Sequence, residues 1–346
     1  MQWYSTEQVT KWHPDKYADQ ISDAIFQEYY NYDKNCHCNI ETFVQNDTVL
    51  VGGNVTVKNN FVANHKAIAD KVAQKLGYTI NQFIDLITPQ SCEIYNAVGY
   101  NDCIGAGDQG IMIGYACNKT ESMLPKGQHI AIKLIQKIED DVENNPNTIL
   151  KGDGKVQVVL NEQQELKQIV VSVCHKEGVT LQQVRNYVEA LIEPPLHTQL
   201  SVNPAGLWTV GGPTADSGLT GRKLVCDNYG PTIPIGGGCF SGKDFTKVDR
   251  SASYMARIIA MNVITEFKTI FDECYVHMGY EIGNPEPISL AIEVYQNGRK
   301  VDYSHSLLNW VLDRYPVAVN DIRNYLNDLN LDFEKMSEGC HFRYKY

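Results

Sequence analysis

Several features that mark large classes of proteins are missing from this chain of 346 residues. No apolar run approaches the roughly 18–20 residues that a membrane-spanning helix needs. The first residues, Met1 to Glu7, form neither a basic leader nor an apolar stretch. We therefore expect no secretory signal and a cytoplasmic protein. The net charge of −11 disfavours a nucleic-acid partner, because such partners bind basic surfaces.

The ten cysteines include no CxxC pair, so neither a zinc ribbon nor a thioredoxin-type motif is visible. The one tight cluster is Cys36-His37-Cys38. In a strand, its two thiols would share a face, which suits a soft metal, but a second ligand pair is lacking. We expect free, mostly buried thiols, as is usual in a reducing compartment.

Amphipathic helices and short strands alternate along the chain, without the regular succession of a doubly wound sheet. This pattern predicts an α+β fold, and the length predicts two or three subdomains. Helical spacing of apolar residues indicates helices over 17–31, 63–76, 181–191, 248–270 and 317–328, and another near 127–140. Strands are expected over 48–57, 155–160, 168–174 and 287–295. Subdomain boundaries are expected near 100–107 and 208–211.

Two basic, glycine-rich segments are the densest chemical signal. One runs from Gly211 to Lys223, and the other from Gly236 to Arg250. Glycines let the backbone approach a ligand and point N–H groups at it, while Arg and Lys side chains bind phosphate oxygens. Five cations lie between positions 222 and 250, namely Arg222, Lys223, Lys243, Lys247 and Arg250. We expect a polyphosphate site here, because such cations would also stabilise a polyphosphate as a leaving group.

The second segment nearly matches a P-loop. Gly237, Gly242 and Lys243 have the required spacing, but Asp244 follows where a P-loop has Ser or Thr. The preceding stretch, 229–235, contains two prolines and does not read as a strand. We therefore do not interpret it as a P-loop.

A third motif, His13-Pro14-Asp15-Lys16, opens the first expected helix, and Asp19 and Asp23 follow at one-turn intervals. A helix N-terminus favours anions, and a carboxylate is how Mg²⁺ is usually held near phosphates. Read alone, His13 would more often be a capping or packing residue. The loops Gly105 to Gly110, with Asp108, and Asp153-Gly154-Lys155 would each read as simple turns.

Taken together and in this order, these segments resemble the S-adenosylmethionine synthetase (methionine adenosyltransferase) family from Glu7 to about Arg343. The stretch from His13 to Asp23 looks like the family's N-terminal signature. Gly105 to Gly110 looks like its GAGDQG hexapeptide, and Gly236 to Ser251 looks like its second signature.

The resemblance implies a fold of three similar α/β subdomains around a pseudo-threefold axis, with ranges 1–100, 105–209 and 210–346 that can interleave. It implies attack of the methionine sulfur on C5′ of ATP with tripolyphosphate as leaving group, followed by tripolyphosphate hydrolysis to phosphate and diphosphate. Two Mg²⁺ and a K⁺ per site are implied as cofactors. A homodimer with active sites at its interface is implied as the assembly, with a tetramer as the alternative.

Site roles follow from matching positions in the resemblance. Catalytic roles would fall to His13, Lys155, Arg222 and Lys243, and His13 would assist departure of the ribose O5′. ATP and its phosphates would contact His13, Asp108, Asp153, Lys155, Trp208, Asp216, Arg222, Lys223, Cys239 and Lys243. Methionine would contact Asn54, Asn101, Asp216 and Lys247. Asp15 and Asp249 would bind Mg²⁺, and Glu41 would bind K⁺.

The chain departs from the family pattern mainly at the methionine end. Only positions 100–104 stand where the family has a longer gating loop, so we expect a shortened lid and weak product inhibition. Asn54 and Asn101 replace a family Glu and Gln, and Trp208 replaces a Phe that stacks on adenine. Two alternatives stay open, an ATP or tripolyphosphate hydrolase and a non-catalytic regulatory homologue. The charged phosphate-binding positions are all retained.

Overall fold

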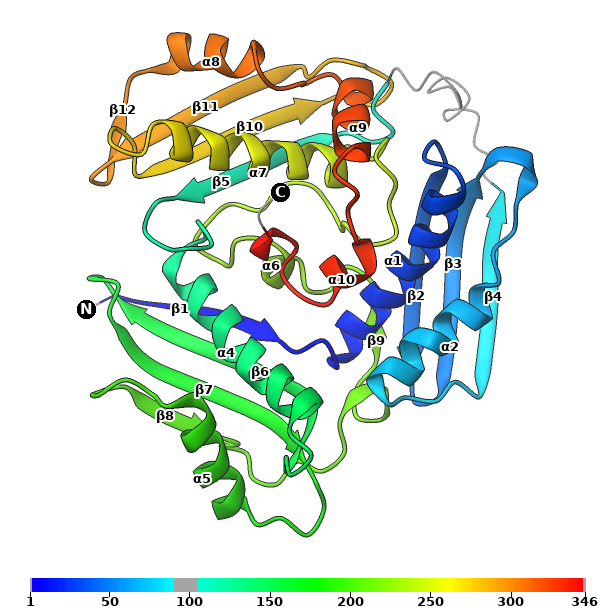
Figure 1. Cartoon of the computed structure of the whole chain (residues 1–346), viewed down its shortest axis with the longest axis vertical. Helices are drawn as coiled ribbons and strands as arrows, with labels where there is room; N and C mark the ends of the chain where they lie inside the picture. Colours follow the sequence, from blue (N-terminus) through cyan, green and yellow to red (C-terminus); the bar gives the residue numbers. More distant parts are fainter. Residues whose placement is uncertain (1, 90–104, 345–346) are drawn as a thin grey trace.

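Three four-stranded sheets frame the described part of the molecule (Figure 1). The structure, a computed structural model, describes residues 2–89 and 105–344. The first sheet has the order β1 (Trp3–Val9), β6 (Leu150–Asn161), β7 (Leu166–His175), β8 (Gln199–Val202). The second has the order β5 (Gly110–Cys117), β10 (Glu273–Tyr280), β11 (Ser289–Gln296), β12 (Arg299–Val301). The third has the order β9 (Gly218–Leu219), β2 (His37–Gln45), β3 (Thr48–Thr56), β4 (Gln82–Pro89).

Each sheet takes one edge strand from a different part of the sequence. β1 pairs with β6, β5 pairs with β10, and β9 pairs with β2, all antiparallel. Within each sheet, the other three strands follow one another in chain order. The repetition confirms the prediction of an α+β fold built from three similar subdomains. Each sheet therefore combines strands from separate parts of the chain, while the subdomain ranges and their interleaving stay a prediction.

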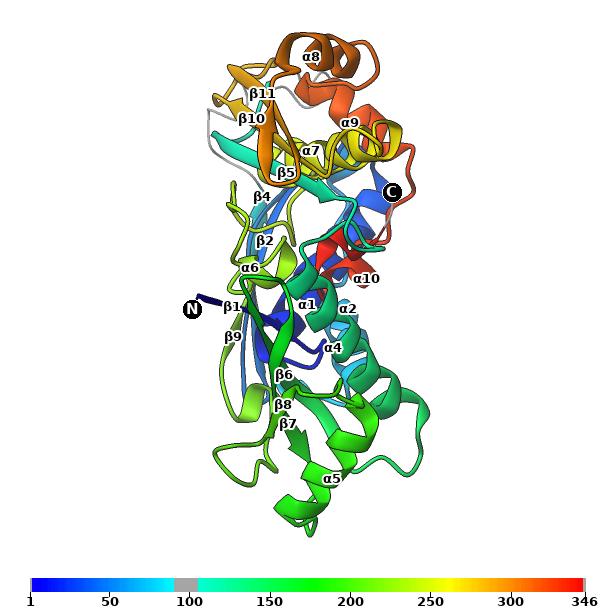
Figure 2. The same ribbon diagram turned by 90° about the vertical axis from the view of Figure 1, so that its left-hand side faces the viewer.

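Helices cover one side of the sheets. α4 (Lys126–Asn144) and α5 (Leu181–Ile192) pack with the first sheet. α7 (Val248–Glu266) and α8 (Ser304–Leu312) pack with the second, and α9 (Val319–Asn327) packs on α7. α1 (Pro14–Tyr32) and α2 (His65–Leu76) pack with the third. Figure 2 shows α2, α4 and α7 on one side and the strands toward the other. The short helices α6 (Leu224–Asp227) and α10 (Phe333–Ser337) lie between the sheets in the middle of Figure 1.

Most expected elements are present, with boundaries shifted by a few residues. Thr180 caps α5 through a capping box, and Gly77 ends α2 in the left-handed conformation, as predicted. The expected helix over 248–270 is too long, because α7 ends at Glu266 and residues 267–270 form turns. No strand or helix occupies 229–247 of the described chain, apart from a bridge at Lys243, which agrees with rejecting the P-loop.

α1 is buried on nearly every side, although its sequence is not uniformly apolar. His13 is its N-cap, and Pro14 takes the first helical position, where a missing N–H costs nothing. Tyr17, Ile21 and Ile25 pack into the main core. A charged face of the same helix is equally buried, so those groups need polar partners elsewhere in the fold.

The segment that leads into α1 is held by Glu139 of α4, whose Oε1 accepts a hydrogen bond from the Lys11 N–H at 2.7 Å. Burial raises the pKa of Glu139 to about 7, although Arg343 and the Lys11 N–H act in the opposite direction. The folded state therefore binds a proton more tightly than the unfolded state. Protonation of Glu139 thus stabilises the folded state; this contribution is complete below about pH 4.5 and is lost as the pH rises through about 7.

Replacement of Glu139 with Gln should flatten this pH dependence, because the amide oxygen can still accept the Lys11 N–H. Between about pH 5 and about pH 8, the wild-type free energy of unfolding should fall relative to the variant by on the order of 1–3 kcal/mol. Urea titrations of both proteins at the two pH values measure the difference. Parallel pH dependences would contradict the expectation.

Candidate active site

A ladder of three aspartates on α1 holds both glycine-rich segments. Asp15, Asp19 and Asp23 lie one turn apart on the same helix face. Their Oδ1 atoms accept backbone N–H hydrogen bonds from Leu219 at 3.0 Å, Gly221 at 2.9 Å and Gly242 at 2.9 Å, respectively. These hydrogen bonds satisfy the buried carboxylates and hold against α1 three backbone groups that are more than 200 residues from their aspartate partners in the sequence.

Two glycines permit this close approach. A Cβ atom at Gly218 would overlap the carbonyl oxygen of Pro14, and one at Gly242 would overlap that of Ile40. Gly242 also has a φ of +80°, which disfavours any residue with a side chain. The backbone of both segments therefore lies directly against α1 and β2.

His13 is neutral at neutral pH. Burial and the positive charge of Lys223 lower its pKa to about 4, with Lys155 acting in the same sense and Asp15 against it. The ring Nδ1 accepts the Asp15 N–H at 3.2 Å. A neutral ring that accepts at Nδ1 carries its proton on Nε2, so His13 can donate one hydrogen bond from that nitrogen.

β6 brings Asp153 and Lys155 to the neighbourhood of His13. Lys155 pairs with Val9 at the end of β1, just before the His13 segment. Asp153 is buried, its Oδ2 accepts the Gly212 N–H at 2.6 Å, and burial raises its pKa to about 6. Asp216 is exposed and acts electrostatically on both His13 and Asp153. Lys155 has no carboxylate within 4.0 Å among residues 2–89 and 105–344.

The first glycine-rich segment places two cations beside Asp15. The Nζ of Lys223 lies 2.5 Å from Asp15 Oδ2, and the Nε of Arg222 lies 3.6 Å from Asp15 Oδ1. Burial opposes ionisation of Asp15, but hydrogen bonds from Lys223 and Leu219 outweigh it and lower its pKa. The Arg222 side chain is 47% exposed, so its guanidinium remains accessible to a ligand.

The second segment forms a similar arrangement around Asp249, at the start of α7. Its Oδ1 accepts the Gly238 N–H at 2.5 Å, and its Oδ2 lies 2.8 Å from the Nζ of Lys243. Asp108 approaches closely enough to donate a hydrogen bond to Asp249 when protonated, and burial and this contact raise the Asp108 pKa. The two arrangements meet where Gly221 contacts Cys239, since a Cβ there would lie 2.7 Å from the Cys239 Cβ.

The residues around Asp15 and Asp249 fit magnesium only if substrate phosphates supply the remaining ligands. The described residues contain no group of three His, Cys, Asp or Glu side chains that could hold a metal alone. Mg²⁺ is usually held by one or two carboxylates together with substrate phosphates. Asp15 and Asp249 each offer one such carboxylate, now neutralised by a lysine. Burial and the neighbouring Asp249 carboxylate raise the pKa of Asp108, and a cation bound here would relieve the repulsion between the two carboxylates.

The residues expected to bind methionine and K⁺ are spread more widely. Lys247 is buried with its Nζ 2.6 Å from Asp244 Oδ2, so its ammonium group is directed at that carboxylate. Asn54 pairs with Asn39 across β2 and β3, and Asn39 bridges to Lys243. Glu41 is exposed on β2, on the same face of the strand as Asn39. Asn101 and the rest of the short loop lie outside the described residues.

Trp208 lies just before the first glycine-rich segment. It is half-buried, and its indole N–H donates to the Val210 carbonyl oxygen at 2.6 Å. Cys239 is also half-buried, and the other described cysteines are free and buried, as expected. The Cys36 and Cys38 sulfur atoms lie 3.7 Å apart, and no metal-binding group forms around them in the described chain.

Sequence reasoning missed the buried supports beneath the site. Lys16 and Asp227 form an ion pair, and Ser22 hydrogen-bonds to both Thr42 and Thr220. The one-turn spacing of Asp15, Asp19 and Asp23 was a visible signal. Their partners were not visible, because these are backbone N–H groups, which every residue except proline carries.

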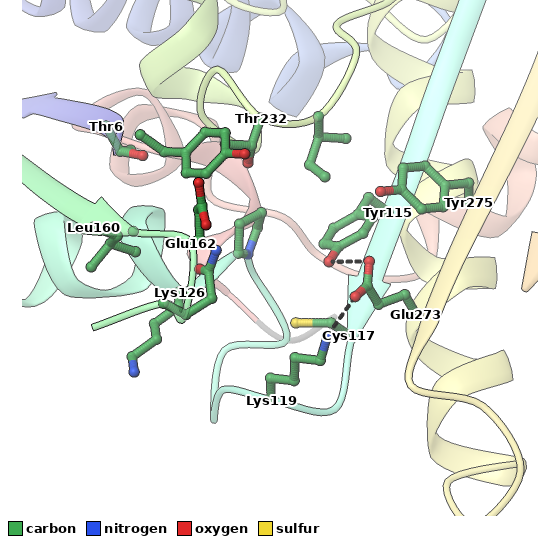
Figure 3. A pocket seen from close by; sticks show the side chains of 15 residues that line it. Thr6, Tyr115, Cys117, Lys119, Lys126, Leu160, Glu162, Thr232, Glu273 and Tyr275 are labelled. Atoms are coloured by element: carbon green, nitrogen blue, oxygen red, sulfur yellow. Dashed lines mark hydrogen bonds and ion pairs between the residues drawn. The ribbon is translucent and has the colours of Figure 1, made fainter. Parts of the chain in front are cut away.

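A pocket of about 540 Å³ lies at the other end of β1, between the first and second sheets (Figure 3). Tyr115 and Tyr275 form one wall, where Glu273 accepts hydrogen bonds from Tyr115 and Lys119. None of the expected site residues lines this pocket.

In the described chain, no helix combines the length and apolar character needed to cross a bilayer.

Three family models match the chain in succession. They describe the N-terminal, central and C-terminal domains of S-adenosylmethionine synthetase and match residues 1–101, 103–208 and 210–346.

Curated relatives extend the similarity over almost the whole chain. The chain is 37% identical to the S-adenosylmethionine synthase of Mycoplasma pneumoniae over 326 residues, covering 90% of this chain and 83% of the relative. It is 36% identical to that of Mycoplasmopsis pulmonis over 355 residues, covering 98% and 93%. It is 35% identical to that of Borrelia garinii over 343 residues, covering 92% and 86%.

Proposed function

Because the chain belongs to the S-adenosylmethionine synthetase family, we propose that the site on α1 transfers the adenosyl group of ATP to L-methionine. The protein is a transferase of S-adenosylmethionine biosynthesis, with ATP and methionine as substrates. One observation carries the assignment of the site. Lys155 and Lys223 lie close enough to His13 to lower its pKa, Arg222 and Lys223 pair with Asp15 at the N-terminus of α1, and Lys243 lies on the adjoining glycine-rich segment.

In the proposed reaction, a lone pair of the methionine sulfur forms a bond to C5′ of ATP. The C5′–O5′ bond breaks, and tripolyphosphate leaves with the electron pair. The sulfur becomes a sulfonium, and negative charge accumulates on the leaving group. The step needs in-line positioning and charge stabilisation more than a general base. The site residues support this, since cations and backbone N–H groups predominate.

His13 has the properties required to assist the leaving oxygen. It is neutral, its ring orientation is set by the Asp15 N–H, and its Nε2–H is the free donor in that tautomer. We assign this donor to O5′. Lys155, Arg222, Lys223 and Lys243 are assigned to the phosphates, with Asp108, Asp153, Trp208, Asp216 and Cys239 around the nucleotide. Asn54, Asn101, Asp216 and Lys247 are assigned to methionine.

We further propose that tripolyphosphate is hydrolysed to diphosphate and phosphate before release. Water would attack a terminal phosphorus atom, and the bond to its bridging oxygen would break. The same cations would stabilise this transition state. Quantifying phosphate, diphosphate and tripolyphosphate in a single turnover tests the step, and release of intact tripolyphosphate would refute it.

The family uses a divalent metal, and we propose two Mg²⁺ per site, held by Asp15 and Asp249 together with phosphate oxygens. Bound Mg²⁺ would neutralise phosphate charge and polarise the bonds that break. Glu41, an exposed carboxylate on β2, is our candidate for K⁺.

Conversion of Asp249 to Asn should raise the Mg²⁺ concentration needed for half-maximal activity several-fold, because the amide removes a negative charge but keeps an oxygen. Titration of activity with MgCl₂ at saturating ATP measures the change. The matched control is Asp272→Asn, in the turn before β10, which should leave the Mg²⁺ dependence unaltered. An unchanged midpoint for Asp249→Asn would argue against the metal assignment.

We propose that the assembly is a homodimer, with a tetramer as the alternative. A partly apolar face of the third sheet supports this proposal. Leu86 is 57% exposed and Ile84 is 36% exposed, and both lie on the face of β4 that continues the Leu50 side of β3. Exposed apolar patches of this kind mark interaction surfaces. Sedimentation velocity of the wild type and of Leu86→Lys tests it, since the variant should dissociate more readily.

The decisive test of function is methionine-dependent formation of S-adenosylmethionine from ATP, followed by mass spectrometry. Release of phosphate without that product would instead indicate an ATP or tripolyphosphate hydrolase. Binding of ATP without turnover would indicate a non-catalytic homologue. Retention of all the charged site residues argues against the last outcome.

A further inference from the structure

A charged cluster lies fully buried beneath the phosphate-binding cations. The Lys16 Nζ lies 2.6 Å from Asp227 Oδ1 and 2.9 Å from Asp19 Oδ2. The side chains of Lys16 and Asp19 are 0% exposed and that of Asp227 is 1% exposed. None of these three residues is expected to touch a substrate.

The cluster brackets the two residues that carry the phosphate-binding cations Arg222 and Lys223. On one side, Asp19 Oδ1 accepts the Gly221 N–H at 2.9 Å. On the other side, Asp227 ends α6, and its N–H donates to the Lys223 carbonyl oxygen at 2.9 Å. Lys16 joins the two aspartates, so the backbone is tied to α1 before Arg222 and after Lys223.

Stability alone does not account for such a cluster. One ammonium and two carboxylates are removed from water here, and apolar groups of similar shape often serve a core at least as well. Burial raises the pKa values of Asp19 and Asp227 although Lys16 opposes it, which shows that desolvation is substantial. The ions also fix direction, because Asp19 binds both the Gly221 N–H and Lys16, and Lys16 binds both aspartates.

Gly221 lies closely against the second glycine-rich segment, in a backbone conformation that favours glycine. Its φ is +79°, and a Cβ would lie 2.7 Å from the Cβ of Cys239 in the second glycine-rich segment. The Arg222 side chain is half-exposed, so the direction of its guanidinium depends on the backbone that carries it. A shift of Gly221 would therefore misdirect Arg222 and disturb the adjoining segment.

We infer that Lys16, Asp19 and Asp227 are positioning residues, which hold the Arg222-Lys223 backbone in the conformation that binds a polyphosphate before any ligand arrives. This inference rests on the proposed function only for the identity of the ligand. Preorganised cations stabilise developing charge without a reorganisation cost during the reaction. Loosening the cluster should therefore lower kcat more than it raises the KM for methionine.

The test compares Asp19→Ala, Asp19→Asn and wild type in the full-length protein. Asp19→Ala removes the acceptor for Gly221 and should lower kcat at least about tenfold and weaken binding of inorganic tripolyphosphate by about the same factor. Asp19→Asn keeps an oxygen for the Gly221 N–H and should recover kcat to within about threefold of wild type. Calorimetric titration with tripolyphosphate supplies the binding readout, and circular dichroism confirms folding.

A matched control is Asp141→Ala in α4. This carboxylate also accepts several hydrogen bonds, from Asn145, Thr148 and Tyr187, but supports no site residue. It should lower stability and leave kcat unchanged. A folded Asp19→Ala enzyme with wild-type kcat and tripolyphosphate affinity would overturn the inference, as would equal kcat losses in Asp19→Ala and Asp141→Ala.

Hydrogen exchange in the wild type keeps the inference testable if Asp19→Ala does not fold. The peptide over 219–227 should be strongly protected in the ligand-free protein, and rapid exchange there would overturn the inference. The proposed function can fail separately. If the wild type forms no S-adenosylmethionine, its tripolyphosphate affinity still reports on the cluster.

Discussion

Replacement of Lys155 by Met should reduce kcat at least about tenfold, a loss of about 1.4 kcal/mol of transition-state stabilisation. Methionine keeps most of the side-chain length and removes the charge together with the N–H donors of the ammonium group. Lys155 lies on β6 opposite the end of β1, close enough to His13 to lower its pKa. In the described chain it has no carboxylate partner, so its charge is available to a ligand.

Steady-state formation of S-adenosylmethionine at saturating ATP and methionine measures the effect. Lys151→Met is the matched control on the same strand, and its kcat should change less than about twofold, because among residues 2–89 and 105–344 the Lys151 Nζ donates to the Thr209 carbonyl oxygen alone. Arg222→Leu should show a loss of at least about tenfold as well. A folded Lys155→Met enzyme with wild-type kcat would refute the assignment.

The pH profile of Lys155→Met gives a second readout. Loss of a positive charge near His13 favours the imidazolium form, so the His13 pKa should rise from about 4 toward its ordinary value of 6.5. The acidic limb of kcat against pH should then move to higher pH, because protonated His13 lacks the Nδ1 acceptor that orients it. An acidic limb at the same pH as in the wild type would contradict an effect of Lys155 on the pKa of His13.

Replacement of Arg250 by Met should lower the free energy of unfolding by about 3–5 kcal/mol, because it leaves Asp23 buried without its counter-ion. The guanidinium group donates to both carboxylate oxygens of Asp23, at 2.7 and 2.9 Å, and to the Lys243 carbonyl oxygen at 3.0 Å. Neither side chain is exposed. The same change should loosen the segment that carries Lys243.

Urea unfolding followed by circular dichroism measures this loss. The control is Lys66→Met, which removes a cation from the exposed pair with Asp70 and should cost only about 0–1 kcal/mol. The double variant Arg250→Met, Asp23→Leu should regain part of the lost stability, since no buried charge remains unpaired. A cost below about 1 kcal/mol for Arg250→Met would contradict the role of the pair.

Local order along the chain was predictable because its causes are local. Thr180 and Gly77 act through hydrogen bonds within one helix turn, and the apolar spacing of 181–191 needs no distant partner. The cations of the two glycine-rich segments were also recognisable from their type and crowding. The α+β class followed from the mixture of periodicities.

By itself, the sequence determined where the main helices lie and the family to which the chain belongs, and it led to the proposal of which residues bind phosphate. Only the tertiary structure decided that β1, β5 and β9 join sheets elsewhere in the chain. It also decided that Asp15, Asp19 and Asp23 hold backbone N–H groups, and that Lys247 is directed at Asp244 while Arg222 remains accessible. The physical reason is that every residue except proline has a backbone N–H, so residue type does not show which N–H a carboxylate binds. The exposure of a charged side chain likewise depends on elements distant in the sequence.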